Sequence, residues 1–98
     1  MVSICVGDPV EITAKMKELG AKFFAYTEDF GKLTQARGAE LIGQVIKDAG
    51  RVDVLVNNAG IIKRAPIHEH PEADWNAVIQ INLSAPFFLS QAVSKWWL

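Results

Sequence analysis

The sequence predicts an α/β fold built on a parallel sheet. Short apolar runs that favour strands alternate with longer stretches whose apolar residues recur at helical spacing, in the order βαβαβα. Strands separated by helices pair in parallel through right-handed crossovers. The chain has 98 residues, 50% of them hydrophobic and 21% charged, so we expect a single globular domain.

The first strand and the first helix are predicted from local signals. Val2–Val6 is a compact run of β-favouring residues. Asp8 can then accept a hydrogen bond from an unsatisfied N–H at a helix start, and Pro9 stands where a missing N–H costs nothing. Gly20 can supply the left-handed residue that ends this helix. Apolar side chains at i, i+4 and i+7 give the helix one face: Ile12, Met16 and Leu19.

The middle of the chain continues the alternation of strand and helix. A second strand is expected over 22–27, followed by a loop and a helix over 33–49 that Gly50 ends. Val52–Val56 is predicted as the third strand, because its consecutive apolar residues are typical of a parallel strand covered on both faces. The buried stripe of the helix is expected to comprise Ile42, Val45, Ile46 and Ala49.

The remainder of the chain is predicted as a loop and two helices. The loop covers 59–71 and contains two prolines, Pro66 and Pro71. The helices follow over 72–83 and 86–97, with a break before Pro86. Three strands therefore alternate with helices along the chain.

Composition and charge exclude several classes of protein. Ten Lys+Arg against eleven Asp+Glu give a net charge of −1, which argues against a nucleic-acid surface. The uncharged apolar runs are far shorter than the roughly 20 residues of a membrane span, and no signal segment follows Met1. The single cysteine, Cys5, excludes an internal disulfide and a Cys-rich zinc site. We therefore expect a cytoplasmic protein with neither a nucleic-acid nor a membrane partner.

The sharpest candidate for a site follows the third predicted strand. In open α/β sheets, ligands bind outside the carboxyl ends of the strands. Asn57 and Asn58 stand at that end, where their amides can bond strand backbones or the hydroxyl groups of a ligand. Ala59 and Gly60 would let a ligand approach the backbone closely. The alternative is an Asx turn that merely closes the strand.

Asn82 is a second candidate, on the helix over 72–83. The helical spacing of Trp75, Val78, Ile79 and Asn82 predicts that the amide lies on the buried face. A buried amide without partners costs about 1–3 kcal/mol, so a partner is expected. Pro86 has no N–H and cannot bond the Asn82 carbonyl, which is therefore free to hold a water. The alternative is a proline-kinked joint with a solvated carbonyl.

These motifs together resemble the short-chain dehydrogenase/reductase family. Its central signature is similar to Asn57-Asn58-Ala59-Gly60 as it follows Val54-Leu55-Val56. The segments 74–75, 81–83 and 87–93 keep the spacing of the family, and 27–30 resembles the loop after its third strand. Within the family, the segment 59–66 resembles the sugar-acid branch, which includes 2-deoxy-D-gluconate 3-dehydrogenase and gluconate 5-dehydrogenase.

The resemblance implies a partial Rossmann-like, doubly wound parallel sheet with three strands. It implies a single incomplete NAD(P)-binding domain over 1–98. The family transfers hydride between a nicotinamide dinucleotide and an alcohol or ketone. We therefore expect NAD, or NADP, as the cofactor and a small-molecule substrate, here a sugar acid such as 2-deoxy-D-gluconate. The intact family member is expected to form a homo-oligomer, a tetramer.

The resemblance also implies roles for individual residues. Asn82 matches the Asn of the catalytic Asn-Ser-Tyr-Lys tetrad, whose backbone carbonyl holds a water linked to the catalytic Lys. The positions beside the adenine ring correspond to Asp29 and Phe30. The positions that pass beside the cofactor's ribose correspond to Asn58, Ala59 and Gly60.

Charged residues and histidines in the predicted loop offer two further hypotheses. Lys63 or Arg64 could attract the carboxylate of a sugar acid, since a guanidinium can form two parallel bonds with it; the alternative is a solvated pair of charges. His68 and His70 invite a metal assignment, but no third strong ligand stands at a recognised spacing. We therefore expect a polar loop here and no metal site.

Two motifs of the family are absent from the 98 residues. The sequence contains neither the Gly-rich Thr-Gly-x-x-x-Gly-x-Gly turn nor the Tyr-x-x-x-Lys pair, and its only tyrosine is Tyr26. The chain matches strand 2 of the family through the helix after strand 4, so we expect a fragment that is inactive by itself. The competing hypothesis is a non-catalytic α/β module that binds a nucleotide weakly or pairs with another chain.

The absent first strand has a topological consequence. In the doubly wound order 3-2-1-4-5-6, that strand lies between the first and third strands predicted here. Leaving its place open would separate two strands by about 10 Å and leave buried backbone groups unpaired. We therefore expect the chain to close into a three-strand sheet, ordered 2-1-3 in its own numbering.

Overall fold

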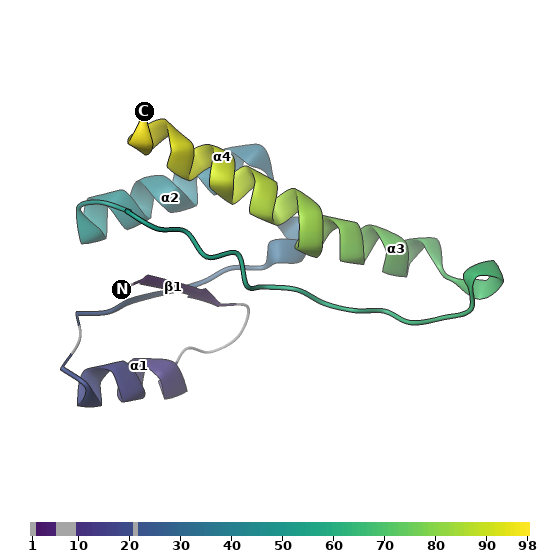
Figure 1. Ribbon diagram of the computed structural model, residues 1–98, viewed down its shortest axis with the longest axis horizontal. Helices are drawn as coiled ribbons and strands as arrows, with labels where there is room; N and C mark the ends of the chain where they lie inside the picture. The colour runs from purple at the N-terminus through teal and green to yellow at the C-terminus, as the bar shows by residue number, and fades with distance from the viewer. Residues whose placement is uncertain (1, 6–9, 21) are drawn as a thin grey trace.

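The computed structural model describes residues 2–5, 10–20 and 22–98 (Figure 1). It confirms an α/β architecture in which a parallel sheet lies between helices. The helix α1 covers one face of the sheet, and the helices α2 and α4 lie on the other side (Figure 1). In chain order the elements are β1 (Val2–Cys5), α1 (Val10–Glu18), β2 (Phe24–Thr27), η1 (Phe30–Lys32), α2 (Gln35–Ala49), η2 (Ile67–Glu69), α3 (Glu72–Ile79), η3 (Gln80–Ser84) and α4 (Ala85–Trp97).

The first two predicted strands pair in parallel. Val2 lies opposite Phe24, and the register continues to Cys5 opposite Thr27. The predicted end of the first strand, at Val6, and the predicted start of the first helix, at Asp8 and Pro9, lie outside the described residues. Gly20 ends the first helix with a φ of 70°, as predicted, because this left-handed conformation suits a residue without a Cβ.

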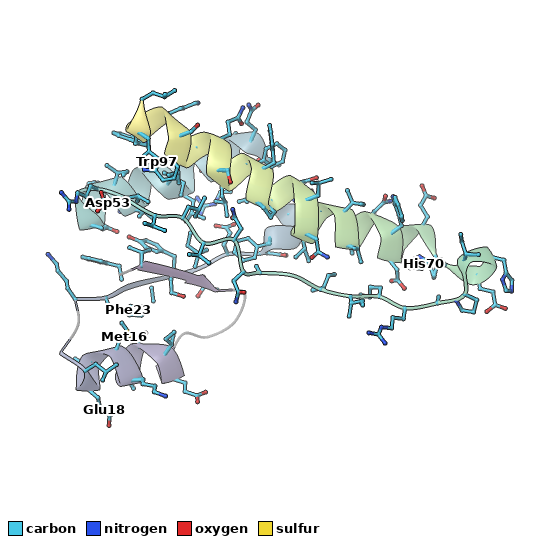
Figure 2. The ribbon with its side chains drawn as sticks, in the orientation of Figure 1. Met16, Glu18, Phe23, Asp53, His70 and Trp97 are labelled. Atoms are coloured by element: carbon cyan, nitrogen blue, oxygen red, sulfur yellow. The ribbon has the colours of Figure 1, made fainter. Side chains whose placement is uncertain are left out.

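The predicted face of α1 is only loosely covered. No residue of α1 is buried, and Leu19, just beyond its end, is 73% exposed. Met16 points toward Phe23 on the sheet side (Figure 2). The periodicity therefore identified the helix correctly. It did not show how much of the apolar face is buried, because that depends on the side chains of the sheet that pack against it.

The prediction of a third strand over Val52–Val56 is wrong. Within the described residues the sheet has two strands, and Val52–Val56 forms no ladder with β1. The chain instead runs without regular secondary structure over 51–66, which we call the extended segment (Figure 1). Val54 and Val56 are each 76% exposed, so the expected cover on both faces is also absent.

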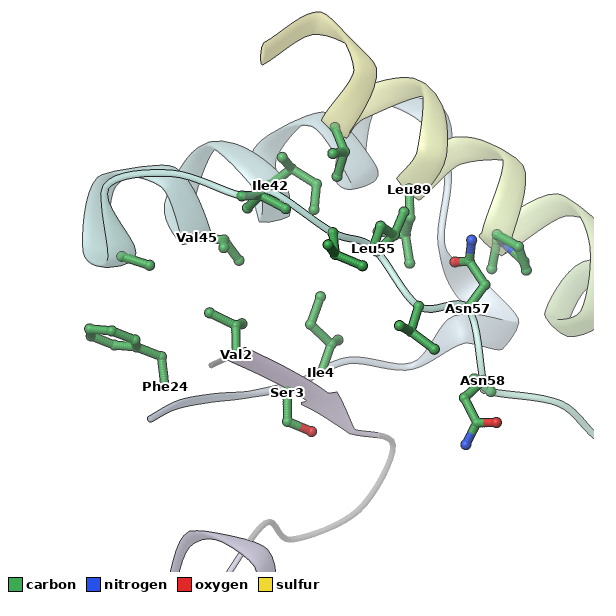
Figure 3. Close-up of a pocket in the computed structure, with 18 of the residues that line it drawn as sticks. Val2, Ser3, Ile4, Phe24, Ile42, Val45, Leu55, Asn57, Asn58 and Leu89 are labelled. Atoms are coloured by element: carbon green, nitrogen blue, oxygen red, sulfur yellow. The ribbon is translucent and has the colours of Figure 1, made fainter. Parts of the chain in front are cut away.

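The expected closure of the sheet is wrong for a related reason. A cavity of about 840 Å³ lies between β1 and the extended segment, lined by Val2 and Ile4 on one side and Leu55 on the other (Figure 3). The extended segment is held to α4 instead, because the Trp97 indole N–H donates to the Val52 carbonyl at 2.6 Å. The extended segment thus lies across the cavity from β1, and the place of a central strand stays open.

The core lies where η1, α2 and α4 meet. Ile42 and Val45 of the predicted stripe are each 2% exposed. Helices α2 and α4 approach closely at Gly38, where an added Cβ would lie 3.4 Å from the Phe88 carbonyl oxygen. The buried cluster comprises Phe30, Leu33, Leu41, Ile42, Ala85, Leu89, Ala92 and Val93.

Helix α2 has well-defined ends. The Thr34 hydroxyl accepts a hydrogen bond from the Arg37 N–H at 3.2 Å, which satisfies one donor of the first turn. At the other end, Gly50 adopts a φ of 91° and its N–H donates to the Ile46 carbonyl at 2.8 Å. The predicted end at Gly50 is confirmed, and the start lies two residues after the predicted one.

The two C-terminal helices are one continuous rod (Figure 1). The predicted break is replaced by η3, a π-helical turn in which the Ala85 N–H donates to the Gln80 carbonyl, five residues earlier. This turn ends at Ser84, two residues before Pro86, whose missing N–H removes one α-helical bond.

The molecule is thin and elongated. Its extents are 50 × 33 × 17 Å and its radius of gyration is 15.3 Å. A compact chain of this length has a radius of gyration of about 13 Å. Among the described helices, each is too short or too polar to cross a bilayer.

Candidate functional site

Asn82 fastens the extended segment to the helical rod. Its Oδ1 accepts from the Ile61 N–H and its Nδ2 donates to the Ile61 carbonyl, each at 2.8 Å. A single amide therefore pairs with both backbone groups of one residue, as a neighbouring strand would. Because Asn82 belongs to η3, this pairing sets the position of the segment relative to the π-turn.

The predicted burial of Asn82 is wrong, although the predicted need for partners is met. Asn82 is exposed, and Trp75 on the same predicted face is 61% exposed. The helical spacing identified residues on one side of the rod. On that side, Asn82 bonds the backbone of the extended segment.

Gly60 lies close to the Asn82 amide. A Cβ at Gly60 would lie 3.3 Å from Asn82 Oδ1, which is tighter than ordinary contact. The absence of a side chain therefore lets the backbone of the extended segment reach the amide. The prediction that a small residue permits close approach holds here for Asn82, a partner within the protein.

The two adjacent asparagines differ in their contacts. Asn57 points toward α4, where its Nδ2 donates to Ser90 Oγ at 3.2 Å, while Asn58 points away (Figure 3). Asn57 thus braces the extended segment against a helix. Among the described residues, Asn58 has no hydrogen-bond partner, so its amide keeps its full bonding capacity.

Asp29 and Phe30 form a tight turn after β2. Asp29 Oδ1 accepts from the Gly31 N–H at 2.9 Å and caps η1. Asp29 is exposed, whereas Phe30 is 4% exposed and belongs to the core. The turn therefore presents a carboxylate at the surface above a fixed aromatic ring.

Gln80 joins this turn to η3 and was not identified from the sequence. Its Nε2 donates to the Phe30 carbonyl at 3.0 Å and to the Leu33 carbonyl at 2.7 Å. No motif marks a glutamine two positions before Asn82. The only available signal is that Gln80 is a polar residue within the otherwise apolar stretch 77–81.

The residues of the predicted site gather in two places around η3. Phe30, Asn58 and Ala59 line the cavity between β1 and the extended segment (Figure 3). Gly60 and Asn82 meet beside it, at the Ile61 backbone.

The charged loop residues lie farther along the extended segment. Lys63 and Arg64 are exposed. His70 Nε2 lies 3.1 Å from the Lys63 carbonyl oxygen, so the ring fastens the loop (Figure 2). In the described part of the chain, no group of three or more His, Cys, Asp or Glu is arranged to hold a metal ion.

A short contact between two titratable side chains lies outside this site. The Tyr26 hydroxyl donates to Asp48 Oδ2 at 2.5 Å and joins β2 to α2. Burial, and then the bond to Asp48, raise the pKa of Tyr26 to about 12. The same bond, with one from Gln44, lowers the pKa of Asp48.

Comparison with known proteins identifies a family and several relatives of this chain. The family profile described as short chain dehydrogenase matches residues 2–98. Over 98 residues the chain is 34% identical to the 2-dehydro-3-deoxy-D-gluconate 5-dehydrogenase of Escherichia coli (strain K12), of which it covers 38%. The match thus takes in all of this chain and well under half of the relative.

Solved structures share the fold. A gluconate 5-dehydrogenase from Burkholderia cenocepacia, in complex with NADP and tartrate, matches with a TM-score of 0.83 and 27% identity, over 96% of this chain and 37% of that one. An NAD+-bound xylitol dehydrogenase matches with a TM-score of 0.86 and 26% identity, over 97% and 37%. The resemblance identified from the Asn57–Gly60 signature is confirmed: the chain belongs to the short chain dehydrogenase family.

Proposed function

We propose that this chain forms part of the dinucleotide-binding domain of an NAD(P)-dependent oxidoreductase that acts on a sugar acid. The observation that carries the proposal is the pairing of Asn82 with the Ile61 backbone at 2.8 Å. It joins the residue matched to the catalytic tetrad with the segment matched to the cofactor's ribose. The sugar-acid substrates in the names of the relatives support the choice of substrate class.

The side chains present fit a dinucleotide. The exposed Asp29 carboxylate has one oxygen left after capping η1, and it can accept from an amine or hydroxyl group near the adenine. The Asn58 amide can bond ribose hydroxyl groups, and Gly60 keeps the backbone accessible. When bound, the nicotinamide would accept or donate the hydride of the reaction.

Asn82 would act through its backbone carbonyl. Pro86 has no N–H to offer that oxygen, and η3 interrupts the α-helical bonding around it. The side chain, already engaged with Ile61, keeps this turn in place. The carbonyl would then hold the water that passes a proton to or from the substrate oxygen.

Arg64 or Lys63 would favour an acidic substrate. Both are exposed on the extended segment beyond Ile61, and a guanidinium can bond a carboxylate through two parallel N–H groups. An Arg64→Ala variant should weaken binding of a sugar acid and leave binding of the neutral sugar unchanged. An equal loss for both ligands would argue against this role.

We also propose that the intact protein assembles with copies of itself through the α3–α4 rod. Trp75, Leu83 and Phe87 are 60–62% exposed on this rod, at intervals of eight and four residues. An exposed apolar stripe of this kind marks an interaction surface. Sedimentation of the wild type and of Phe87→Glu tests the assembly, which the charge should weaken.

The direct test of the proposed function is a titration with NADH and NADPH. Saturable quenching of tryptophan fluorescence is expected for the wild type and weaker binding for Asn58→Ala. Asn76→Ala, an exposed asparagine on α3, is the matched control. The 98 residues should show no turnover by themselves, because the sequence contains no Tyr-x-x-x-Lys pair. No saturable change with either nucleotide would argue against cofactor binding and favour a module that pairs with another chain.

A further inference from the structure

Gln80 makes an unusual pair of contacts for a helical residue. Its side-chain amide, partly buried, donates to two carbonyls of one turn, Phe30 at 3.0 Å and Leu33 at 2.7 Å. Only the NH₂ group of the amide can face two acceptors at once, so the orientation of the side chain is fixed. The contact joins residues 47 and 50 positions apart in the sequence.

The amide adds to the hydrogen bonds within the turn, which include Lys32 N–H to the Asp29 carbonyl at 3.0 Å and Gly31 N–H to Asp29 Oδ1 at 2.9 Å. The bond that closes η1, from the Leu33 N–H to the Phe30 carbonyl, measures 3.4 Å and is long for an N–H···O bond. Gln80 supplies the shorter bond to the same oxygen. The turn that carries the exposed Asp29 carboxylate and the buried Phe30 ring is therefore held to the C-terminal rod through Gln80.

Gln80 and Asn82 hold different loops from the same π-turn. Residues two positions apart on a helix point to different sides. Gln80 forms hydrogen bonds with the turn at 29–33, and Asn82 forms them with the extended segment at Ile61. The π-turn thus sets the spacing between the two loops through two side-chain amides.

We infer that Gln80 is a positioning residue for the adenosine half of the cofactor. It acts through the Phe30 and Leu33 carbonyls, and among the described residues its side-chain amide has no hydrogen bond to the extended segment that Asn82 holds. The inference rests on the proposed function, since Asp29 and Phe30 are assigned there to the adenine side. Removing the Gln80 amide should therefore loosen the adenosine side alone.

Backbone amide exchange in the full chain tests the local part of the inference. Gln80→Met keeps the length of the side chain and removes both donors, and Gln80→Glu keeps its shape and polarity in case the first variant folds poorly. Each should speed exchange at Gly31, Lys32 and Leu33 about tenfold and leave Ile61 unchanged. Gln91→Met on α4, which removes an amide bonded to Gln35 at 3.0 Å, is the matched control and should change neither loop. Unchanged exchange in the turn, or equal acceleration at Ile61, overturns the inference.

Titration with AMP and with nicotinamide mononucleotide tests the cofactor part. The Gln80 variants should raise the Kd for AMP about tenfold and leave that for nicotinamide mononucleotide unchanged. Equal weakening of both ligands, or unchanged AMP binding, identifies a merely structural tie and overturns the inference. If the wild type binds neither ligand, the proposed function fails. Faster amide exchange in the turn of the Gln80 variants would then still show that Gln80 holds the turn, so the two failures can be told apart.

Discussion

Three asparagines allow the contribution of the loop contacts to be measured within one residue type. Asn82 makes two bonds at 2.8 Å, Asn57 makes one at 3.2 Å, and among the described residues Asn58 has no partner. Alanine substitutions should therefore lower the free energy of unfolding in the order Asn82, Asn57, Asn58. The order follows from the number of hydrogen bonds lost, because the side-chain change is the same at each position; only Asn82 also lies in a helix.

The magnitude follows from the two bonds of Asn82. Each bond contributes about 0.5–1.5 kcal/mol net, and alanine returns up to about 0.7 kcal/mol of helix propensity. Asn82→Ala should therefore destabilise the chain by about 1 kcal/mol. A domain of this length has about 5–15 kcal/mol of stability in total. Asn57→Ala should lose about 0.5 kcal/mol, and Asn58→Ala close to nothing.

Urea unfolding followed by tryptophan fluorescence provides the assay. With a slope of about 2 kcal/mol per M, 1 kcal/mol moves the midpoint by about 0.5 M. Gly60→Ala adds a check, because its Cβ would press on Asn82 Oδ1 at 3.3 Å. Its effect should shrink in the Asn82→Ala background, since the contact is then gone. Equal losses at Asn58 and Asn82 would refute the reasoning.

Three further outcomes are expected elsewhere in the chain. Gly50→Ala should lower the free energy of unfolding by about 1–2 kcal/mol, because the φ of Gly50 is 91°. Gly43→Ala, inside α2 with open space around it, should raise that free energy by up to about 1 kcal/mol. Thermal unfolding of the two variants tests this, and changes of the same sign would contradict it. Burial, and then the bond to Asp48, raise the pKa of Tyr26 from 10.0 to about 12. The stability that the neutral hydroxyl contributes is therefore present below pH 10 and lost as pH rises toward 12. Tyr26→Phe should remove that slope from the pH profile of unfolding, and a slope of unchanged size would contradict the assignment. Trp97→Phe removes the indole N–H and should speed amide exchange in the extended segment, with a cost of about 1 kcal/mol; unchanged exchange would show that the bond does not hold it.

Local signals in the sequence were sufficient for the helices. Gly50 and Gly20 end α2 and α1 as predicted, because the left-handed conformation is a property of the residue itself. The start of α2 was missed by two residues, since the Thr34 cap was not recognised. The parallel pairing of β1 and β2 also followed from the alternation of strand and helix.

The third strand could not be predicted in the same way. Val52–Val56 has the composition of a buried strand, but a strand requires a partner along its edge. Trp97, 45 residues away, holds Val52 to the helical layer instead. That bond depends on how the C-terminal rod packs, and no local pattern contains this information.

The site was found in part. The signature at Asn57–Gly60 and the residue Asn82 were identified, while the contact between Asn82 and Ile61 was not. Gln80 was missed entirely, because its partners are backbone carbonyls of a distant turn and any residue type could have supplied them.

The thin, elongated shape has a consequence for the thermodynamics of unfolding. The folded chain exposes 7099 Å², whereas a compact protein of its mass, 10.8 kDa, would expose about 5,500 Å². Folding therefore removes about 15% less surface from water than it would for a compact chain. Because the heat capacity increment scales with newly exposed apolar area, calorimetry should give an increment per residue at or below the usual range of about 12–15 cal/mol/K. The stability curve of this chain should be correspondingly flat, with a broad maximum and a shallow approach to both cold and heat denaturation.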